Sequence, residues 1–337
     1  MYFSIIIPVY NRPDEIDELL ESLVKQDYKS PFEVVIVEDG SSIDCKSVVE
    51  KYSNRLNINY FFKQNSGPGD SRNYGMNNAN GDYFIIFDSD CIIPKHYLSE
   101  VDLALKKKFT DCFGGPDKAL DSFSDIQKAI NFSMTSFLTT GGIRGASEKI
   151  DKFQPRSFNM GISKNAFLAS AGFGNIHPGE DPDLSIRLWM LNFETQLIST
   201  AYVYHKRRID WSKFYHQVYK FGKARPILNT WYPEYNKPTF FFPTLFIIGL
   251  FIAVALVLFL GLFFPLALYG LYFLLLFCIA TYSYKSISIG SLSVIAVIIQ
   301  FYGYGFGFLQ SFILIQLMNK NPKEVFPELF FNKSIND

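Results

Sequence analysis

Tyr83-Phe84-Ile85-Ile86-Phe87-Asp88-Ser89-Asp90 combines an apolar run with two carboxylates one residue apart. The apolar run predicts a buried strand, and the carboxylates follow at the point where that strand leaves the core. Such a pair can bind a divalent metal ion together with a diphosphate. Asp and Ser are also common turn residues, so the triplet alone fits a solvated loop as well. Its interpretation therefore depends on the surrounding sequence.

The first 90 residues alternate between strand and helix patterns. The expected elements follow one another at 2–9, 13–23, 33–37, 45–52, 58–62, 72–78 and 83–87, beginning with a strand. This alternation predicts an α/β fold with a mostly parallel sheet and helices on both faces. Ligands of such folds bind beyond the carboxyl ends of the strands. Tyr10, Asp39 and Asp88 all lie at those ends, so we expect them to line one crevice.

Several motifs together resemble the family 2 glycosyltransferases, whose nucleotide-sugar domain has the GT-A fold. The motifs are Pro8-Val9-Tyr10-Asn11-Arg12, Glu38-Asp39-Gly40-Ser41, Asn65 to Asn73, Asp88-Ser89-Asp90, Asn159-Met160-Gly161-Ile162 and Gly179 to Arg187. They extend over the first two thirds of the chain in the family's order. The resemblance implies a GT-A, Rossmann-like α/β domain with a mixed sheet over residues 1–210, followed by an α-helical transmembrane region.

The resemblance also implies which residues bind the nucleotide part of the donor. These are Pro8, Tyr10, Asn11, Asp39, Arg72, Asp88 and Ser89. Asp39 is expected to hydrogen-bond the base, with Pro8 and Tyr10 in the wall around it, while Arg72 can bind a phosphate through two hydrogen bonds. On local grounds, an Asx-type turn before Gly40 explains Asp39 equally well. A surface ion pair with Asp70 is the alternative for Arg72.

The expected metal site is also carried over from the family. Asp90 is the implied direct ligand, Asp88 lies near the ribose and the metal, and His205 is a candidate third contact to metal or phosphate. Hard oxygen ligands favour Mn²⁺ or Mg²⁺, which offsets the charge on a leaving diphosphate. A structural histidine at a strand end remains the alternative for His205.

Glu180-Asp181 is the second carboxylate pair that the resemblance marks. Asp181 is the implied general base, which takes the proton of the acceptor hydroxyl in a single inverting displacement. Glu180 is the alternative base. Both acids also suit the first turn of the helix that follows them, which would be a purely structural role.

Composition changes near Thr239, because Lys285 is the only charged residue between there and Met318. Three apolar segments, at 240–263, 266–284 and 289–317, are each long enough for a membrane span of about 20 residues. The expected organisation is a juxtamembrane amphipathic segment at 211–238, transmembrane helices within 239–318 and a C-terminal tail at 319–337. The rule that basic loops stay inside places the N-terminal domain in the cytoplasm.

The side of the tail is left open by the sequence. Three spans put the tail outside, whereas Lys320 and Lys323 favour the inside. Gly303, Gly305 and Gly307 allow either close helix packing or a break in the third segment. A break there would create a re-entrant segment and return the tail to the cytoplasm.

Other features limit the remaining functions. Formal net charge of zero argues against a nucleic-acid partner, and four scattered cysteines give no zinc or disulfide framework. The least regular stretch, residues 117–152, includes Thr139 to Gly145, which we expect to be a loop that orders over the donor.

We therefore expect a multi-pass enzyme of the cytoplasmic (inner) membrane, an inverting, metal-dependent glycosyltransferase of the hexosyltransferase type. Its partners would be a nucleoside-diphosphate sugar, with UDP favoured, a lipid-linked or glycan acceptor, and membrane lipids. The expected pathway is cell-surface polysaccharide assembly. Alternatives are a processive polysaccharide synthase, a non-enzymatic nucleotide-sugar-binding membrane scaffold, and a nucleotidyltransferase. Against the first, the sequence does not contain the Gln-x-x-Arg-Trp motif of processive synthases.

Overall fold

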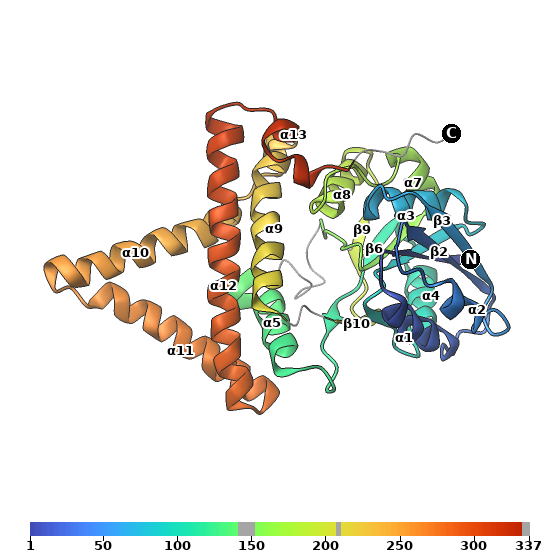
Figure 1. The fold of residues 1–337 in the computed structure, drawn as a ribbon, viewed down its shortest axis with the longest axis horizontal. Helices are drawn as coiled ribbons and strands as arrows, with labels where there is room; N and C mark the ends of the chain where they lie inside the picture. Colours follow the sequence, from blue (N-terminus) through green and yellow to red (C-terminus); the bar gives the residue numbers. More distant parts are fainter. Residues whose placement is uncertain (141–151, 207–209, 332–337) are drawn as a thin grey trace. The chain divides into compact units, whose positions relative to one another are not determined.

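The computed structural model describes residues 1–140, 152–206 and 210–331 (Figure 1). The chain divides into two compact units. The N-terminal unit comprises Met1–Lys118, Ser147–Lys206 and Phe330–Asp337, and the helical unit comprises Ala119–Ala146 and Arg207–Leu329. Most of the loop expected to order over the donor, Thr139 to Gly145, lies outside the described residues.

A seven-stranded mixed sheet forms the centre of the N-terminal unit, in the order β3-β2-β1-β4-β8-β6-β9. Its strands are β1 (Phe3–Val9), β2 (Phe32–Asp39), β3 (Ile58–Lys63), β4 (Tyr83–Phe87), β6 (Cys112–Gly114), β8 (Asn159–Ser163) and β9 (Thr195–Leu197). β1, β2, β3 and β4 are parallel to one another, whereas β8 runs antiparallel to both β4 and β6. The predicted α/β fold and its mixed sheet are confirmed.

Helices cover both faces of this sheet because the strands are apolar on both sides. The helices are α1 (Pro13–Val24), α2 (Lys46–Glu50), α3 (Pro68–Asn77), α4 (Tyr97–Lys107), α7 (Lys164–Ser170) and α8 (Glu180–Met190). Alternate residues of β1 point to opposite faces: Ile5 packs in one core cluster with α1 and α4, and Ile6 packs in the other with α3, α7 and α8.

A second, three-stranded sheet lies in the same unit in the order β5-β10-β7. Its strands are β5 (Cys91–Ile92), β7 (Asp117–Lys118) and β10 (Val203–His205). Antiparallel pairing of β5 with β10 sets His205 opposite Cys91, and β7 runs parallel to β10. This small sheet therefore brings the end of the Asp88-Ser89-Asp90 turn to the imidazole of His205.

The helical unit contains the apolar segments. Its helices and turns are α5 (Asp125–Thr135), α6 (Phe137–Thr140), α9 (Trp211–Trp231), η1 (Pro233–Tyr235), η2 (Pro238–Phe241), α10 (Phe242–Leu260), α11 (Phe264–Tyr284), α12 (Ile287–Ser311), η3 (Phe312–Leu317), α13 (Pro322–Val325) and η4 (Pro327–Leu329). Figure 1 shows α9 beside α12, while α10 and α11 form a hairpin.

Close packing of α9 on α12 depends on glycine. A Cβ atom at Gly222 would lie 2.2 Å from the carbonyl oxygen of Tyr304, and one at Gly307 would lie 2.2 Å from that of Tyr219. α12 continues through Gly303, Gly305 and Gly307 without a break. Of the two roles that the sequence left open for these glycines, the structure shows close helix packing.

The boundary between the units differs from the sequence-based division at residue 210. Helix α5 belongs to the helical unit although it precedes β8 and α8 in the chain. Its start is fixed by a capping box between Ser124 and Gln127, and its buried Ile130 packs with Phe214 and Ala296. Because these contacts join residues more than 80 positions apart, composition along the chain did not reveal them.

Three helices are long and apolar enough to cross a membrane: Pro238–Leu260, Phe264–Tyr284 and Ile287–Leu317. They agree with the expected segments to within a few residues. The third differs from the others because much more of it is buried inside the protein.

Candidate active site

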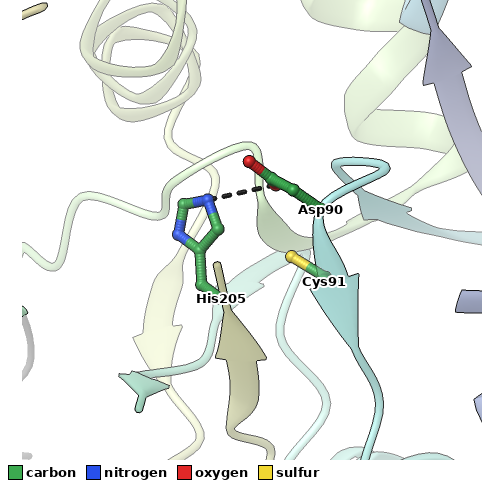
Figure 2. Close-up of side chains that lie close together, drawn as sticks. All are labelled: Asp90, Cys91 and His205. Atoms are coloured by element: carbon green, nitrogen blue, oxygen red, sulfur yellow. Dashed lines mark ion pairs between the residues drawn. The ribbon is translucent and has the colours of Figure 1, made fainter. Parts of the chain in front are cut away.

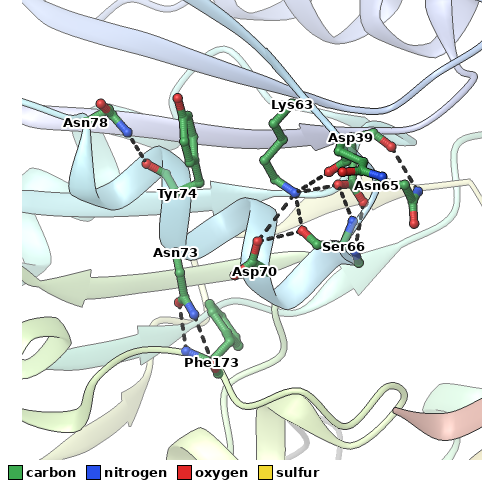
Figure 3. A network of polar contacts seen from close by, with 11 residues as sticks. Asp39, Lys63, Asn65, Ser66, Asp70, Asn73, Tyr74, Asn78 and Phe173 are labelled. Carbon is green, nitrogen blue, oxygen red and sulfur yellow. Dashed lines mark hydrogen bonds and ion pairs between the residues drawn. The ribbon is translucent and has the colours of Figure 1, made fainter. Parts of the chain in front are cut away.

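Asp39, at the end of β2, is held by a network of polar contacts (Figure 3). Its Oδ1 accepts hydrogen bonds from Lys63 Nζ (2.6 Å) and from the Ser66 amide (3.0 Å), and its Oδ2 accepts one from the Gly67 amide (3.0 Å). The side chain is almost completely buried. Since a carboxylate oxygen can accept two hydrogen bonds, Oδ2 keeps capacity for a donor group of a bound base.

The first motif contributes one exposed ring and one structural side chain. Tyr10 is 53% exposed and can form the wall of a base pocket. Asn11 has a φ of 53°, and its Oδ1 accepts hydrogen bonds from the backbone amides of Ser42 (2.9 Å) and Ile43 (3.0 Å). Asn11 therefore links the turn after β2 to the end of β1 by hydrogen bonds. Pro8 lies within β1.

Arg72, on α3, connects two of the expected sites. It is 3% exposed, and its guanidinium lies 2.6 Å from Asp88 Oδ1 and 3.1 Å from Glu180 Oε1. Burial disfavours the cation, but the carboxylates of Asp88 and Glu180 outweigh that effect and raise the pKa of Arg72. Asp70, the alternative partner, instead accepts a hydrogen bond from Ser66 and pairs with Lys63.

Both carboxylate oxygens of Glu180 have partners in this network. Besides Arg72, its Oε1 lies 2.8 Å from His177 Nδ1, and its Oε2 accepts a hydrogen bond from the Gly179 amide (3.0 Å). Burial opposes ionisation, but His177 and Arg72 together lower the pKa of Glu180 to about 2. Burial likewise disfavours the His177 cation, yet the Glu180 carboxylate raises the pKa of His177. Glu180 is therefore a permanently charged partner of Arg72 and a poor proton acceptor.

Asp181 is the carboxylate of the pair that can still accept a proton. Its Oδ1 is buried and accepts no hydrogen bond from the residues that the structure describes. Burial and the neighbouring Glu180 charge raise the pKa of Asp181 to about 6, against the opposing effects of Arg72 and Arg156. A carboxylate with a pKa near the working pH is well suited to act as a general base.

The candidate metal site comprises Asp90, Cys91 and His205 (Figure 2). Their ligand atoms lie within 4.8 Å of one another, with 3.2 Å between His205 Nε2 and Asp90 Oδ1. Asp117 Oδ2 lies 3.9 Å from the other ring nitrogen of His205, where a carboxylate can orient the imidazole. A carboxylate oxygen and an imidazole nitrogen are ligands that Mn²⁺ accepts, so this donor set fits the expected ion.

The structure shows the partners of three further residues in this region. Asp88, expected near the metal, points its Oδ1 to Arg72. Cys91 was missed, because its pairing with His205 depends on β5 and β10 meeting across the chain; its Sγ donates to the Phe158 carbonyl at 3.4 Å. Ser89, expected on the nucleotide side, donates to Glu15 Oε2 at 3.2 Å.

Sequence comparison finds a known family for the first half of the chain. The model of glycosyl transferase family 2 matches residues 4–169. The poly(ribitol-phosphate) beta-N-acetylglucosaminyltransferase TarS of Staphylococcus aureus (strain Mu50) is 40% identical over 114 residues, which are 33% of this chain and 20% of TarS. The GalNAc(5)-diNAcBac-PP-undecaprenol beta-1,3-glucosyltransferase of Campylobacter jejuni is 31% identical over 150 residues, 40% of this chain and 48% of that protein. The chain thus matches less than half of the length of each relative.

Solved structures show the same fold. A crystal structure of TarS residues 1–349 is similar with a TM-score of 0.50 and 25% identity, over 67% of this chain and 65% of that one. The mannosyltransferase PcManGT from Pyrobaculum calidifontis, in complex with GDP-Man and Mn²⁺, has a TM-score of 0.58 at 15% identity, over 89% of this chain and 86% of that one. Residues 4–169, which hold most of the GT-A-like mixed sheet, therefore match glycosyl transferase family 2.

Proposed function

We propose that this glycosyltransferase is an inverting, metal-dependent enzyme that acts at the cytoplasmic membrane surface. It transfers one hexose-type sugar from a nucleoside diphosphate, with UDP favoured, to a hydroxyl group of a lipid-linked glycan in cell-surface polysaccharide assembly. The observation that carries this proposal is the arrangement around Arg72, which joins the turn of Asp88 to the helix that presents Asp181.

The donor side would use residues from three strand ends. Asp39 binds the base through Oδ2, and the exposed ring of Tyr10 covers it. Asp90 and His205 would hold Mn²⁺ or Mg²⁺, which when bound supplies positive charge to the diphosphate and makes it a better leaving group. Arg72 fixes Asp88 beside that site, which keeps the turn in place when the donor binds.

On the acceptor side, Asp181 takes the proton from the attacking hydroxyl. A bond then forms between the acceptor oxygen and the anomeric carbon, while the bond from that carbon to the diphosphate oxygen breaks. A single displacement inverts the anomeric configuration. Glu180 stays ionised throughout and keeps Arg72 in place, because its low pKa makes it a weak base at neutral pH.

The acceptor class is inferred from relatives and composition. The Campylobacter jejuni relative is named for an undecaprenol-linked acceptor, and the TarS relative for poly(ribitol-phosphate). Three long apolar helices in the same chain favour an acceptor that is itself held in a membrane. The structure of TarS with UDP-GlcNAc supports the preference for UDP.

A donor panel tests the proposal and its metal site together. Purified enzyme in lipid is given UDP-, GDP- and dTDP-sugars with Mn²⁺, Mg²⁺ or a chelator, and donor binding and hydrolysis are measured. We expect one metal-dependent UDP-sugar, and we expect Asp90→Ala to lose about 10²-fold or more of its turnover, since a bound metal supplies several kcal/mol. Asp121→Ala, an exposed carboxylate in the helical unit, is the matched control and should behave as wild type. Full turnover of Asp90→Ala, or turnover unaffected by chelator, contradicts the metal assignment.

The pH dependence of kcat/KM follows from the raised pKa of Asp181. A general base acts only when deprotonated, so activity should be lost as pH falls through about 6, where this carboxyl takes up a proton. The expected profile is flat above pH 7 and decreases tenfold per pH unit below the midpoint. A midpoint near 4, the ordinary range of an aspartate, would mean that the base lies elsewhere.

A further inference from the structure

The segment after α12 packs back on the helix that precedes all three apolar segments. Lys223 of α9 lies 2.9 Å from Glu328, and its Nζ lies 4.7 Å from the centre of the Phe326 ring. Phe326 and Leu329 are buried. These contacts lie within the helical unit, and they join a residue before the hairpin of α10 and α11 to residues beyond α12. The two ends of the apolar region therefore lie together.

The N-terminal unit gives an independent observation of the same kind. Phe330 forms a β-bridge with Ile176, and the Phe331 amide donates to the Asn175 carbonyl at 2.9 Å. The Phe331 ring lies beside Gly67, on the loop that holds Asp39, and its centre is 6.0 Å from that of His177. The tail at Phe330 and Phe331 is thus part of the N-terminal unit. A bilayer cannot separate residues that touch.

α12 has polar partners near both of its ends. Near its start Ser288 donates to Asp125 of α5 at 3.0 Å, and Tyr219 of α9 bonds Gln310 near its end. In the following turn η3, the Gln316 amide donates to the Pro226 carbonyl at 3.2 Å. The helix beside it, α9, carries Lys213 and Lys220 as exposed cations. A lysine at the centre of a membrane helix costs about 2.5–3.5 kcal/mol, so α9 and α12 together do not fit the hydrocarbon core.

The hairpin of α10 and α11 has the opposite character. Its first turns pack on α12, where Thr244 donates to the Gly305 carbonyl at 3.1 Å. Beyond that, its large apolar side chains are exposed, including Phe251, Leu258, Phe259, Phe263, Phe264 and Leu271. α10 contains 19 residues and is therefore about 28 Å long, close to the thickness of the hydrocarbon core of a bilayer.

α12 adds an apolar stripe to this surface. Ile295, Ile298 and Phe306 of α12 are exposed at helical spacing, and Ile313 continues the stripe in η3. Tyr302 of α12 contacts Phe251 of α10 with ring centres 6.2 Å apart. A helix with charged neighbours on one side and an exposed apolar stripe on the other is suited to the membrane interface.

We infer that only α10 and α11 enter the bilayer, as a hairpin that leaves on the side from which it entered, while α12 lies along the membrane surface in a bundle with α5 and α9. The number of crossings is even, and the tail is on the same side as the catalytic unit. Lys320 and Lys323 then share a side with the basic residues of α9, as the rule for basic loops requires. This inference rests on the membrane placement in the proposed function.

Cysteine labelling tests the inference on the full chain. The background variant is Cys278→Ala, because the other three cysteines are buried. Asn54→Cys marks the catalytic unit and Lys323→Cys marks the tail, both at exposed positions. Each variant is reconstituted in sealed vesicles and treated with a membrane-impermeant maleimide before and after permeabilisation, and the orientation of each preparation is measured by protease digestion.

We expect Asn54→Cys and Lys323→Cys to be labelled to the same extent under every condition. Labelling of Lys323→Cys only in the vesicle fraction that protects Asn54→Cys would overturn the even number of crossings and leave the proposed transfer reaction untouched. A carbonate wash tests the second way in which the inference can fail, namely that the protein is not inserted in the membrane. If the protein is released from the vesicles, the membrane placement is wrong, and the inference fails together with that part of the proposed function.

Discussion

Asp181→Asn is expected to lower transfer by about 10²–10⁴-fold while leaving donor binding unchanged, since a positioned general base contributes about this much to a rate. The reason lies in its surroundings. Burial and the Glu180 charge raise the pKa of Asp181 to about 6, so the carboxylate is both ionised at neutral pH and basic enough to accept a proton. Asparagine has nearly the same shape but cannot accept that proton.

The same substitution should increase stability above pH 7. A carboxyl whose pKa is higher in the folded state than in the unfolded state contributes stability below the unfolded value, and this contribution is lost as pH rises through about 6. Each pKa unit corresponds to about 1.4 kcal/mol, so for this partly exposed residue we expect Asn to raise the free energy of unfolding by about 1–2 kcal/mol. At pH 5 the gain should be smaller.

Asp183→Asn is the matched control, because Asp183 lies on the same helix and pairs with Arg187 at 2.7 Å. It should lower the melting temperature and keep the turnover of properly folded enzyme. Initial rates, donor binding by calorimetry and thermal melts at pH 5 and pH 8 distinguish the two variants. Turnover of Asp181→Asn within threefold of wild type would remove Asp181 as the base.

The sequence predicted the strand ends better than the contacts among them. Alternating patterns placed Asp39 and Asp88 at the carboxyl ends of two parallel strands, because period and turn residues are local properties. The pairing of His205 with Cys91 depends instead on an antiparallel contact across more than 100 positions. Nothing in either short strand specifies its partner, so the cysteine beside Asp90 was not recognised as a possible ligand.

Arg72 illustrates the same limit with an ion pair. Asp70 is close in sequence, but residues two apart on a helix do not face each other. The structure pairs Arg72 with Asp88 and with Glu180, which is 108 positions away. The fold therefore pairs Arg72 with carboxylates that are distant in the sequence. The alternative, a surface ion pair with Asp70, was wrong.

Helix α5 and the tail show why the domain boundaries were harder still. α5 has the amphipathic pattern of any surface helix, and the pattern alone does not say which unit its apolar face covers. Phe330 and Phe331 follow the apolar region in sequence but belong to the N-terminal unit. Contacts that close such long loops depend on the complete fold, whereas the change of composition near Thr239 could be read directly.

Arg72→Ala is expected to have the largest effect on stability. Removing one member of a buried ion pair costs about 3–5 kcal/mol, because the remaining charges lose their compensation. Here Asp88 and Glu180 would both lose a cation that is 3% exposed. We expect a large fall in the melting temperature and loss of transfer, since the turn of Asp88 and the helix of Asp181 are no longer joined.

Two further variants separate positioning from simple unfolding. Arg72→Lys retains the charge but cannot reach two carboxylates with a planar fork, so it should recover part of the stability and little of the turnover.

Arg72 also lowers the pKa of Asp181, so its loss should move the acid limb of the kcat/KM profile, where activity falls with decreasing pH, above pH 6. Glu180→Gln removes the largest opposing charge, and in the double variant with Arg72→Lys this limb should return toward lower pH. A melting temperature unchanged in Arg72→Ala, or an acid limb that stays in place for the residual activity of Arg72→Ala, would show that Arg72 does not couple the donor side to the base.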